Sequence, residues 1–159
     1  SEATKRKSTN YARKQPWTKD EIIEHLKERC GSKEVEVATK IFNWIEKHFE
    51  GIDYGSAKTS GAVIPWIKKG KDWYGPFALW SFGYLEMYFQ YMAKKEVFQS
   101  DDLRLKMVDK LNKIDTIELP PDAIYKRPSI RLEQLTDEKS LREFLNVIEW
   151  FIDKVKENQ

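Results

Sequence analysis

The stretch 77-FALWSFGYLEMYFQYM-92 decides the fold class. Its second half alternates with a period of two, so side chains fall on two faces: Leu85, Met87, Phe89 and Tyr91 on one, and Tyr84, Glu86, Tyr88 and Gln90 on the other. The Phe82-Gly83 pair predicts a tight turn that joins this strand, residues 84–92, to the preceding strand 77-FALWS-81. The stretch therefore predicts an antiparallel hairpin.

The predicted sheet extends on both sides of this hairpin. Upstream, 62-AVIPWI-67 is a strand pattern, and Pro65 predicts an edge or a bulge because it has no N–H for a strand ladder. With the hairpin it forms a three-stranded meander. Two further strands are predicted downstream, at 116-TIEL-119 and 129-SIRLEQL-135.

Four helices complete the pattern. Thr18 and Glu21 form a capping box for a helix that runs to about Cys30, and Gly31 separates it from a second helix that ends before Gly51. Ser100 caps a third helix, which reaches about residue 113. The last helix follows an imperfect capping box of Thr136 and Lys139. The order ααβββαββα predicts an α+β fold with a mainly antiparallel sheet and helices on one face.

The ends of the chain differ in composition from its body. Residues 1–16, SEATKRKSTNYARKQP, are polar and basic, which predicts a disordered tail or linker, either between domains or as an arm that touches phosphates. Residues 17–159 then form a single α+β domain. The chain starts at Ser1, so we expect neighbouring domains of a longer protein. Although the net charge is +2, residues 20–159 sum to −3, which argues against a broad nucleic-acid platform.

Several classes of protein are excluded by the composition. No apolar run is long enough to span a membrane and no signal peptide is visible, so we expect a cytoplasmic protein with no membrane partner. Cys30, His25 and His48 are too few for a structural zinc site, and we expect no metal ion and no cofactor. The nucleophile motif GxSxG is absent as well, so no catalytic residue is assigned.

The segment 54-YGSAKTSG-61 has the composition of a phosphate-binding loop. A true phosphate loop needs its lysine directly after the second glycine and a helix directly after the loop, whereas here Lys58 precedes Gly61 and a strand follows. Two interpretations stay open. One is a structural turn, and the other is a weak anion contact made by Ser56, Lys58, Thr59 and Ser60.

The segment 66-WIKKGKDWYG-75 is typical of nucleic-acid contacts. It places lysines beside aromatic residues, so that phosphate neutralisation and base stacking are possible side by side. The candidate binding residues are Trp66, Lys68, Lys69, Lys71, Trp73 and Tyr74. The alternative is a solvated hairpin loop whose aromatic residues face the core.

A metal-dependent nuclease would need acidic residues that converge at strand ends, often with a lysine nearby. Asp53 and Glu86 are the candidate carboxylates, with Lys58 as the candidate lysine. No acid-x-lysine triplet follows Glu86 on its strand, so this possibility ranks below nucleic-acid binding without catalysis.

The chain also resembles a known group of bacterial proteins. The residues that carry the resemblance are Trp17, Tyr54-Gly55 with Gly61 and Pro65, Lys126-Arg127-Pro128-Ser129, and 141-LREFLNVIEWFIDKV-155. The group is an accessory module at the ends of multidomain proteins associated with restriction and defence. The resemblance implies an accessory domain and supplies no catalytic residue.

The sequence therefore predicts a non-catalytic accessory module of a nucleic-acid-directed, restriction- or defence-like system, which contacts nucleic acid through a lysine and aromatic edge. Two alternatives stay open: a protein-interaction domain, suggested by the six tryptophans, and a metal-dependent nuclease.

Overall fold

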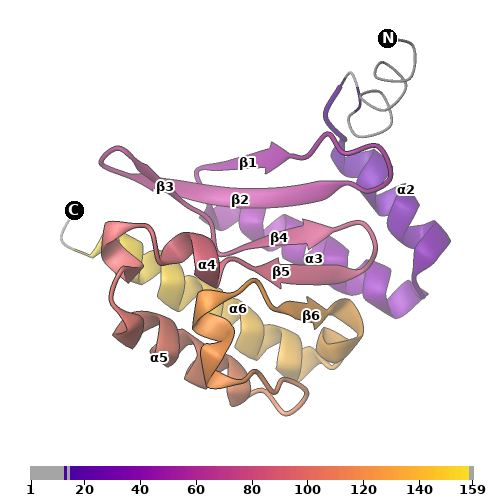
Figure 1. Ribbon diagram of the computed structural model, residues 1–159. Coiled ribbons are helices and arrows are strands. Elements are labelled where there is room, and N and C mark those ends of the chain that lie inside the picture. Colours follow the sequence, from indigo (N-terminus) through magenta and orange to yellow (C-terminus); the bar gives the residue numbers. More distant parts are fainter. Residues whose placement is uncertain (1–12, 14, 158–159) are drawn as a thin grey trace, which may run out of the picture.

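The computed structural model describes residue 13 and residues 15–157, and it confirms the α+β fold with an antiparallel sheet (Figure 1). The α-helices of the described part are α2 (Lys19–Arg29), α3 (Ser32–His48), α4 (Phe89–Met92), α5 (Asp101–Asn112) and α6 (Glu138–Lys156). The strands are β1 (Gly51–Tyr54), β2 (Ala62–Lys69), β3 (Asp72–Tyr74), β4 (Phe77–Trp80), β5 (Tyr84–Met87) and β6 (Ser129–Arg131). Three short 3-10 helices are η1 (Glu96–Phe98), η2 (Pro121–Tyr125) and η3 (Leu132–Leu135).

The predicted meander is confirmed. The strand order is β1-β2-β4-β5-β6, with β3 also paired to β2, and every pair is antiparallel. Residues 81–83 turn the chain between β4 and β5, and Trp80 pairs with Tyr84 across the turn. Gly83 adopts φ 103°, which side chains disfavour, so the glycine is required at this turn.

The two faces of the sheet have different surroundings. Helices α3 and α6 lie behind the sheet in Figure 1, and the strand side chains that point toward them, such as Val63, Ile67 and Leu79, are buried. No helix of the described chain lies over the front of β1, β2 and β4. We call this front the outer face; the register places on it Asp53, Ile64, Trp66, Lys68, Trp73, Ala78, Trp80, Tyr84 and Glu86.

The predicted strand 84–92 is too long. The strand ends at Met87, and α4 follows it, because the backbone N–H of Met92 donates to the Tyr88 carbonyl. Phe89 and Met92 are both buried, at the spacing of three that a helical turn provides. The alternating pattern of aromatic residues therefore predicted a strand longer than the one that forms.

The predicted strand 116–119 does not form. Its backbone groups bond to side chains instead of a neighbouring strand: the Leu119 N–H donates to the Asn112 Oδ1, and the Thr116 carbonyl accepts from the Gln134 Nε2. The predicted strand 129–135 is correct only over β6, because η3 begins at Leu132. The order ααβββαββα is thus incomplete: it contains one strand that does not form and lacks β1, β3 and α4.

Pro65 was expected at an edge or a bulge. It is not at an edge, but the register of the strands beside β2 shifts by one residue between Val63 and Ile67, as at a bulge. On one side Pro65 pairs with Ile52 of β1. On its other side the β4 ladder stops at Val63 and the β3 ladder starts at Ile67, so Pro65 lies between two ladders. An internal strand therefore tolerates this proline because no partner needs its missing N–H.

The helix starts were predicted in part. The capping box of Thr18 and Glu21 is present in both directions, and Ser100 caps α5 by accepting from the Asp102 N–H. The predicted cap at Thr136 is wrong. Asp137 caps α6 instead, with its carboxylate accepting from the Ser140 N–H at 3.2 Å.

Most of the predicted tail, residues 1–12 and 14, lies outside the described residues. Arg13 and Trp17 lie against the segment that follows β1: the Arg13 N–H donates to the Ser56 carbonyl, and the Trp17 N–H to that of Gly55. Among the helices of the described part, none combines the length and apolar character that a membrane crossing requires.

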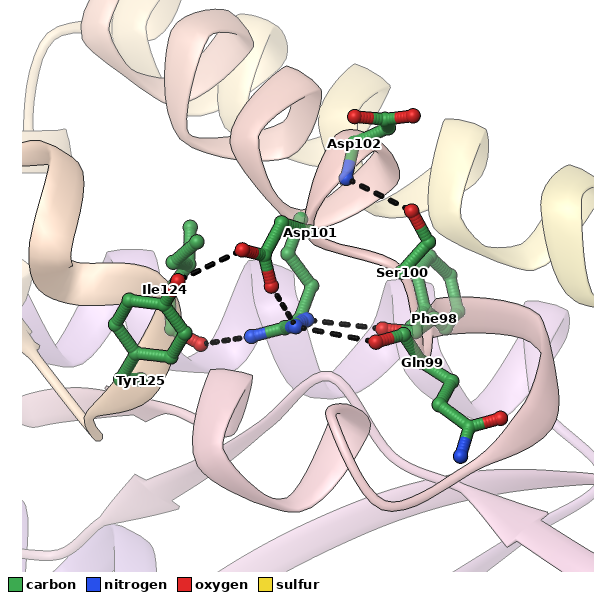
Figure 2. Close-up of polar contacts among 8 residues, drawn as sticks. Phe98, Gln99, Ser100, Asp101, Asp102, Ile124 and Tyr125 are labelled. Atoms are coloured by element: carbon green, nitrogen blue, oxygen red, sulfur yellow. Dashed lines mark hydrogen bonds and ion pairs between the residues drawn. The ribbon is translucent and has the colours of Figure 1, made fainter.

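A buried arginine joins α5 to its neighbours (Figure 2). The Arg104 guanidinium donates to three backbone carbonyls, those of Phe98, Gln99 and Ile124, and to the Asp101 carboxylate. It thereby links η1, the start of α5 and η2, which hold the segment after α4 in place.

Candidate functional site

The segment 54–61 is built as a structural loop. The Trp17 indole N–H donates to the Ala57 carbonyl at 2.7 Å, and the Gly61 N–H donates to the Ser81 Oγ at 2.8 Å. A side chain at Gly61 would lie 2.7 Å from the Ile22 Cγ1, so the loop packs directly against α2. The four candidate anion contacts differ in exposure: Ser56, Lys58 and Thr59 are exposed, and Ser60 is buried.

The hairpin of β2 and β3 divides the second set of candidates between two faces. Trp66, Lys68 and Trp73 lie on the outer face. Tyr74 faces the core and is only 2% exposed, and Lys69 lies on the same side, where its Nζ donates to the Glu157 carbonyl at 2.8 Å. Lys71 is exposed at the hairpin tip.

The two candidate sets lie at opposite ends of β2 (Figure 1). Lys58 is in the loop before Ala62, and Lys68 is near the other end of the strand. The six residue-to-residue steps along the strand from Ala62 to Lys68 span about 20 Å. Lys58 and Lys68 therefore belong to separate parts of the surface.

The two nuclease carboxylates share the outer face but are far apart. Asp53 lies on β1 and Glu86 on β5, and the strand order places β2 and β4 between them. Three strand spacings of about 4.8 Å separate them by roughly 14 Å. Asp53 and Glu86 consequently cannot bind the same metal ion. Over residue 13 and residues 15–157, no three His, Cys, Asp or Glu residues group as metal ligands.

His25 and Ser81 come together, although they are far apart in sequence. The His25 Nδ1 lies 2.6 Å from the Ser81 Oγ, which also accepts the Gly61 N–H. Ser81 is fully buried, so a substrate cannot reach its hydroxyl. The pair braces the loop after β1 against α2 and is not a hydrolytic site.

A pocket of about 190 Å³ opens beside the outer face at the hairpin end of the sheet. We call it the aromatic pocket. Its aromatic lining comes from Trp66, Trp73, Tyr88 and Tyr91. The Trp66 and Trp73 rings meet edge to face with their centres 4.2 Å apart, and the Tyr88 and Tyr91 rings do so with their centres 4.8 Å apart. Trp73 is 47% exposed and Tyr91 is 39% exposed, so two large rings of the lining face solvent.

Charged groups surround the aromatic pocket. Asp53 and Lys95 line it, and the Asp53 Oδ1 accepts the Trp66 indole N–H at 3.3 Å. Two further cations contact lining rings from outside the cavity. The Lys68 Nζ lies 5.3 Å from the centre of the Trp73 ring, and the Arg127 guanidinium lies 5.3 Å from that of Tyr91. Each contact has the geometry of a cation–π interaction.

Burial changes the titration of two lining groups. It raises the pKa of Tyr88 to about 12, and the nearby Glu86 carboxylate acts in the same direction. Burial also lowers the pKa of Lys95, while the Asp72 carboxylate opposes this shift. The pocket is therefore a partly desolvated environment, in which hydrogen bonds to a ligand are stronger than at an open surface.

Sequence reasoning found only part of this pocket. It singled out Trp66 and Trp73 as binding residues but missed Tyr88, Tyr91 and Lys95. The two tyrosines were missed because the strand expected over 84–92 places them on opposite faces. The structure brings them together because α4 starts at Phe89. Their separation of three residues was the signal for a helical turn.

No protein-family model matches the chain, and neither a curated protein nor a solved structure shows significant similarity to it. The resemblance to a restriction- and defence-associated accessory module therefore stays a prediction. The geometry of the aromatic pocket is the basis for a functional proposal.

Proposed function

We propose that the chain binds single-stranded nucleic acid at the aromatic pocket and does not catalyse a reaction on it. The observation that carries the proposal is the pair of cation–π contacts at the pocket, in which Lys68 lies over the Trp73 ring and Arg127 over the Tyr91 ring. Proteins that bind single strands combine rings on which bases stack with cations that neutralise phosphates.

The small size of the pocket supports binding of a single strand rather than of a duplex. Its lining rings lie in a cavity of about 190 Å³, which a base enters only when it is unpaired and unstacked. The body of the protein has a net charge of −3 over residues 20–159, which argues against a broad platform for a duplex. A short single-stranded segment is the ligand that suits a small basic and aromatic site.

The test is binding of fluorescently labelled single-stranded oligonucleotides, measured by polarisation at low and at moderate salt. We expect affinity that falls with salt, and we expect Trp73→Ala to weaken it by about 1 to 3 kcal/mol, the contribution of one stacked base. The matched control is Phe82→Ala. Phe82 is 38% exposed but lies in the turn between β4 and β5, outside the pocket, so its loss should leave affinity unchanged.

Two results would reject the proposal. One is the absence of binding at low salt, and the other is an equal loss of affinity in the two variants. The protein-interaction alternative predicts a different outcome from the same experiment. In that case a proline-rich peptide, which also docks on clustered aromatic rings, would bind in a Trp73-dependent way while oligonucleotides would not.

A further inference from the structure

The aromatic pocket has room for one flat ring system. Its volume of about 190 Å³ equals the liquid volume of about six water molecules. Ile64 and Gly75 also line the pocket. A side chain at Gly75 would lie 2.9 Å from the Pro65 carbonyl oxygen, so the backbone approaches closely at this point. One base fits, and a second must lie outside.

The charges distinguish between two ligands that aromatic pockets commonly bind. A quaternary ammonium group also favours rings and a carboxylate. Here, however, Lys95 lines the pocket, and Lys68 and Arg127 already contact two of its rings. The pocket lining holds one ammonium and one carboxylate, Lys95 and Asp53, and the Glu86 and Asp72 carboxylates lie close enough to act on Tyr88 and Lys95. The Lys95 ammonium within the lining opposes a cationic ligand and can donate to a carbonyl or phosphate oxygen of a nucleotide.

Asp53 is the lining group that can tell one base from another. An ionised carboxylate offers about four acceptor positions and no donor. The Trp66 indole N–H occupies one of them, at 3.3 Å from Oδ1, and it fixes the orientation of the carboxylate. Both oxygens therefore keep the capacity to accept from a ligand, side by side.

The bases differ in what they present to two adjacent acceptors. Guanine presents two neighbouring donors, its ring N1–H and its exocyclic N2–H. Adenine and cytosine present one amino donor next to a ring acceptor, and uracil or thymine presents one N–H between two carbonyls. Only guanine can donate to both oxygens of a carboxylate; each of the other bases would place an acceptor atom against one of the two oxygens. Its O6 is an acceptor, which the Lys95 ammonium can meet as a donor.

We propose that the aromatic pocket selects an unpaired guanine, with Asp53 as the specificity-determining residue. This inference rests on the proposed binding of single strands and adds the identity of the base. The carboxylate pairs with the N1–H and N2–H of the base while the rings stack on its faces.

The test uses thymine oligonucleotides of one length that carry a single central guanine, inosine, adenine or cytosine. Inosine keeps the N1–H and O6 of guanine and lacks only the amino group. We expect the guanine strand to bind at least fivefold more tightly than the adenine, cytosine and all-thymine strands, with inosine in between, because a matched pair of hydrogen bonds discriminates to that extent.

Asp53→Asn should remove the guanine preference, so that the variant binds the guanine strand and the all-thymine strand with similar affinity. Glu86→Gln is the matched control. Glu86 is a carboxylate on the same outer face, and it too accepts an indole N–H, that of Trp80 at 3.4 Å, but it does not line the aromatic pocket. The preference should survive this change.

The possible failures are distinguishable. Equal binding of all strands, or a guanine preference that survives Asp53→Asn, overturns guanine selection and leaves single-strand binding in place. Absence of binding to every strand overturns both proposals. Displacement of a bound strand by tetramethylammonium at low concentration, with no effect of guanosine monophosphate, would identify a cation site and would also overturn guanine selection.

Discussion

Arg104 shows how a charged residue can be part of the core. It is 2% exposed and is the only charged side chain buried within the described part of the chain. Three of its acceptors are backbone carbonyls that no helix or strand satisfies, and its ion-pair partner Asp101 is half exposed (Figure 2). The guanidinium therefore stabilises the fold mainly by filling the hydrogen-bonding needs of buried backbone.

Replacing Arg104 should destabilise the protein strongly. Arg104→Met keeps the length of the side chain but leaves the carbonyls of Phe98 and Ile124 without a donor, at about 1 to 3 kcal/mol for each buried group. We expect the free energy of unfolding, measured by urea denaturation, to fall by about 3 kcal/mol. Asp101→Asn is the control and should cost less than about 1 kcal/mol, because Asp101 is exposed. Equal effects would show that the ion pair, and not the carbonyl contacts, is what matters.

Tyr88 should make stability depend on alkaline pH. Its pKa rises from 10.0 to about 12 on folding, because burial disfavours the phenolate. The folded state then holds this proton more tightly than the unfolded state, so the contribution is fully present below pH 10 and is lost as the pH rises toward 12. Tyr54, Tyr74 and Tyr84, whose pKa values are also raised by desolvation, act in the same direction.

The measurement compares unfolding of the native chain and of Tyr88→Phe across this range. The native chain should lose more stability than the variant between pH 10 and 12, and spectroscopic titration should show one fewer late-ionising tyrosine in the variant. Identical pH profiles would mean that Tyr88 ionises as freely in the folded protein as in the unfolded chain.

At the level of elements, the sequence predicted best where the signal was local. The capping box at Thr18 and the turn at Gly83 depend on residues within three or four positions, and both are present. The strand expected at 116–119 does not form, and the one expected at 84–92 ends at Met87, because groups outside these segments take up their backbone bonds. Asn112 and Gln134 take up the backbone bonds of the first, and the carbonyl of Lys126 accepts the Gln90 N–H in the second.

The start of α6 provides a direct comparison of two adjacent residues. Asp137 accepts the Ser140 N–H and lies at the positive end of the helix dipole, whereas the Thr136 hydroxyl donates to the Glu133 carbonyl. Asp137→Ala should therefore lower the free energy of unfolding by about 1 kcal/mol, the usual loss for a helix cap. Thr136→Ala should cost no more than about 0.5 kcal/mol, as for an ordinary surface position. Urea denaturation of both variants tests the assignment, and a larger loss at Thr136 would contradict it.

At the level of the whole molecule, the candidate site is assembled from distant segments. Asp53 comes from β1, Trp66 and Trp73 from the hairpin of β2 and β3, and Tyr91 from α4. Composition could identify the aromatic and basic hairpin, because its residues are contiguous. It could not identify Asp53 or Tyr91 as neighbours of that hairpin, since their proximity depends on strand order and on where α4 begins.

The same geometry separates the lysines into two groups and leads to a prediction about charge. About 20 Å of β2 lies between Ala62, which follows the Lys58 loop, and Lys68, which contacts Trp73 at the aromatic pocket. At physiological ionic strength the Debye length is about 8 Å, so a charge at Lys58 is screened from a strand bound at the pocket.

Lys68→Glu should therefore weaken binding of single-stranded oligonucleotides about tenfold, and Lys58→Glu by less than about twofold, when both are measured at physiological salt. Loss of one phosphate contact should also lower the slope of log affinity against log salt by about 0.7 in Lys68→Glu and leave it unchanged in Lys58→Glu. The two variants change the net charge equally, so each controls for the other. Equal losses would show that the strand follows the whole length of β2, from the loop before Ala62 to the hairpin, and that the aromatic pocket is only one part of a longer binding surface.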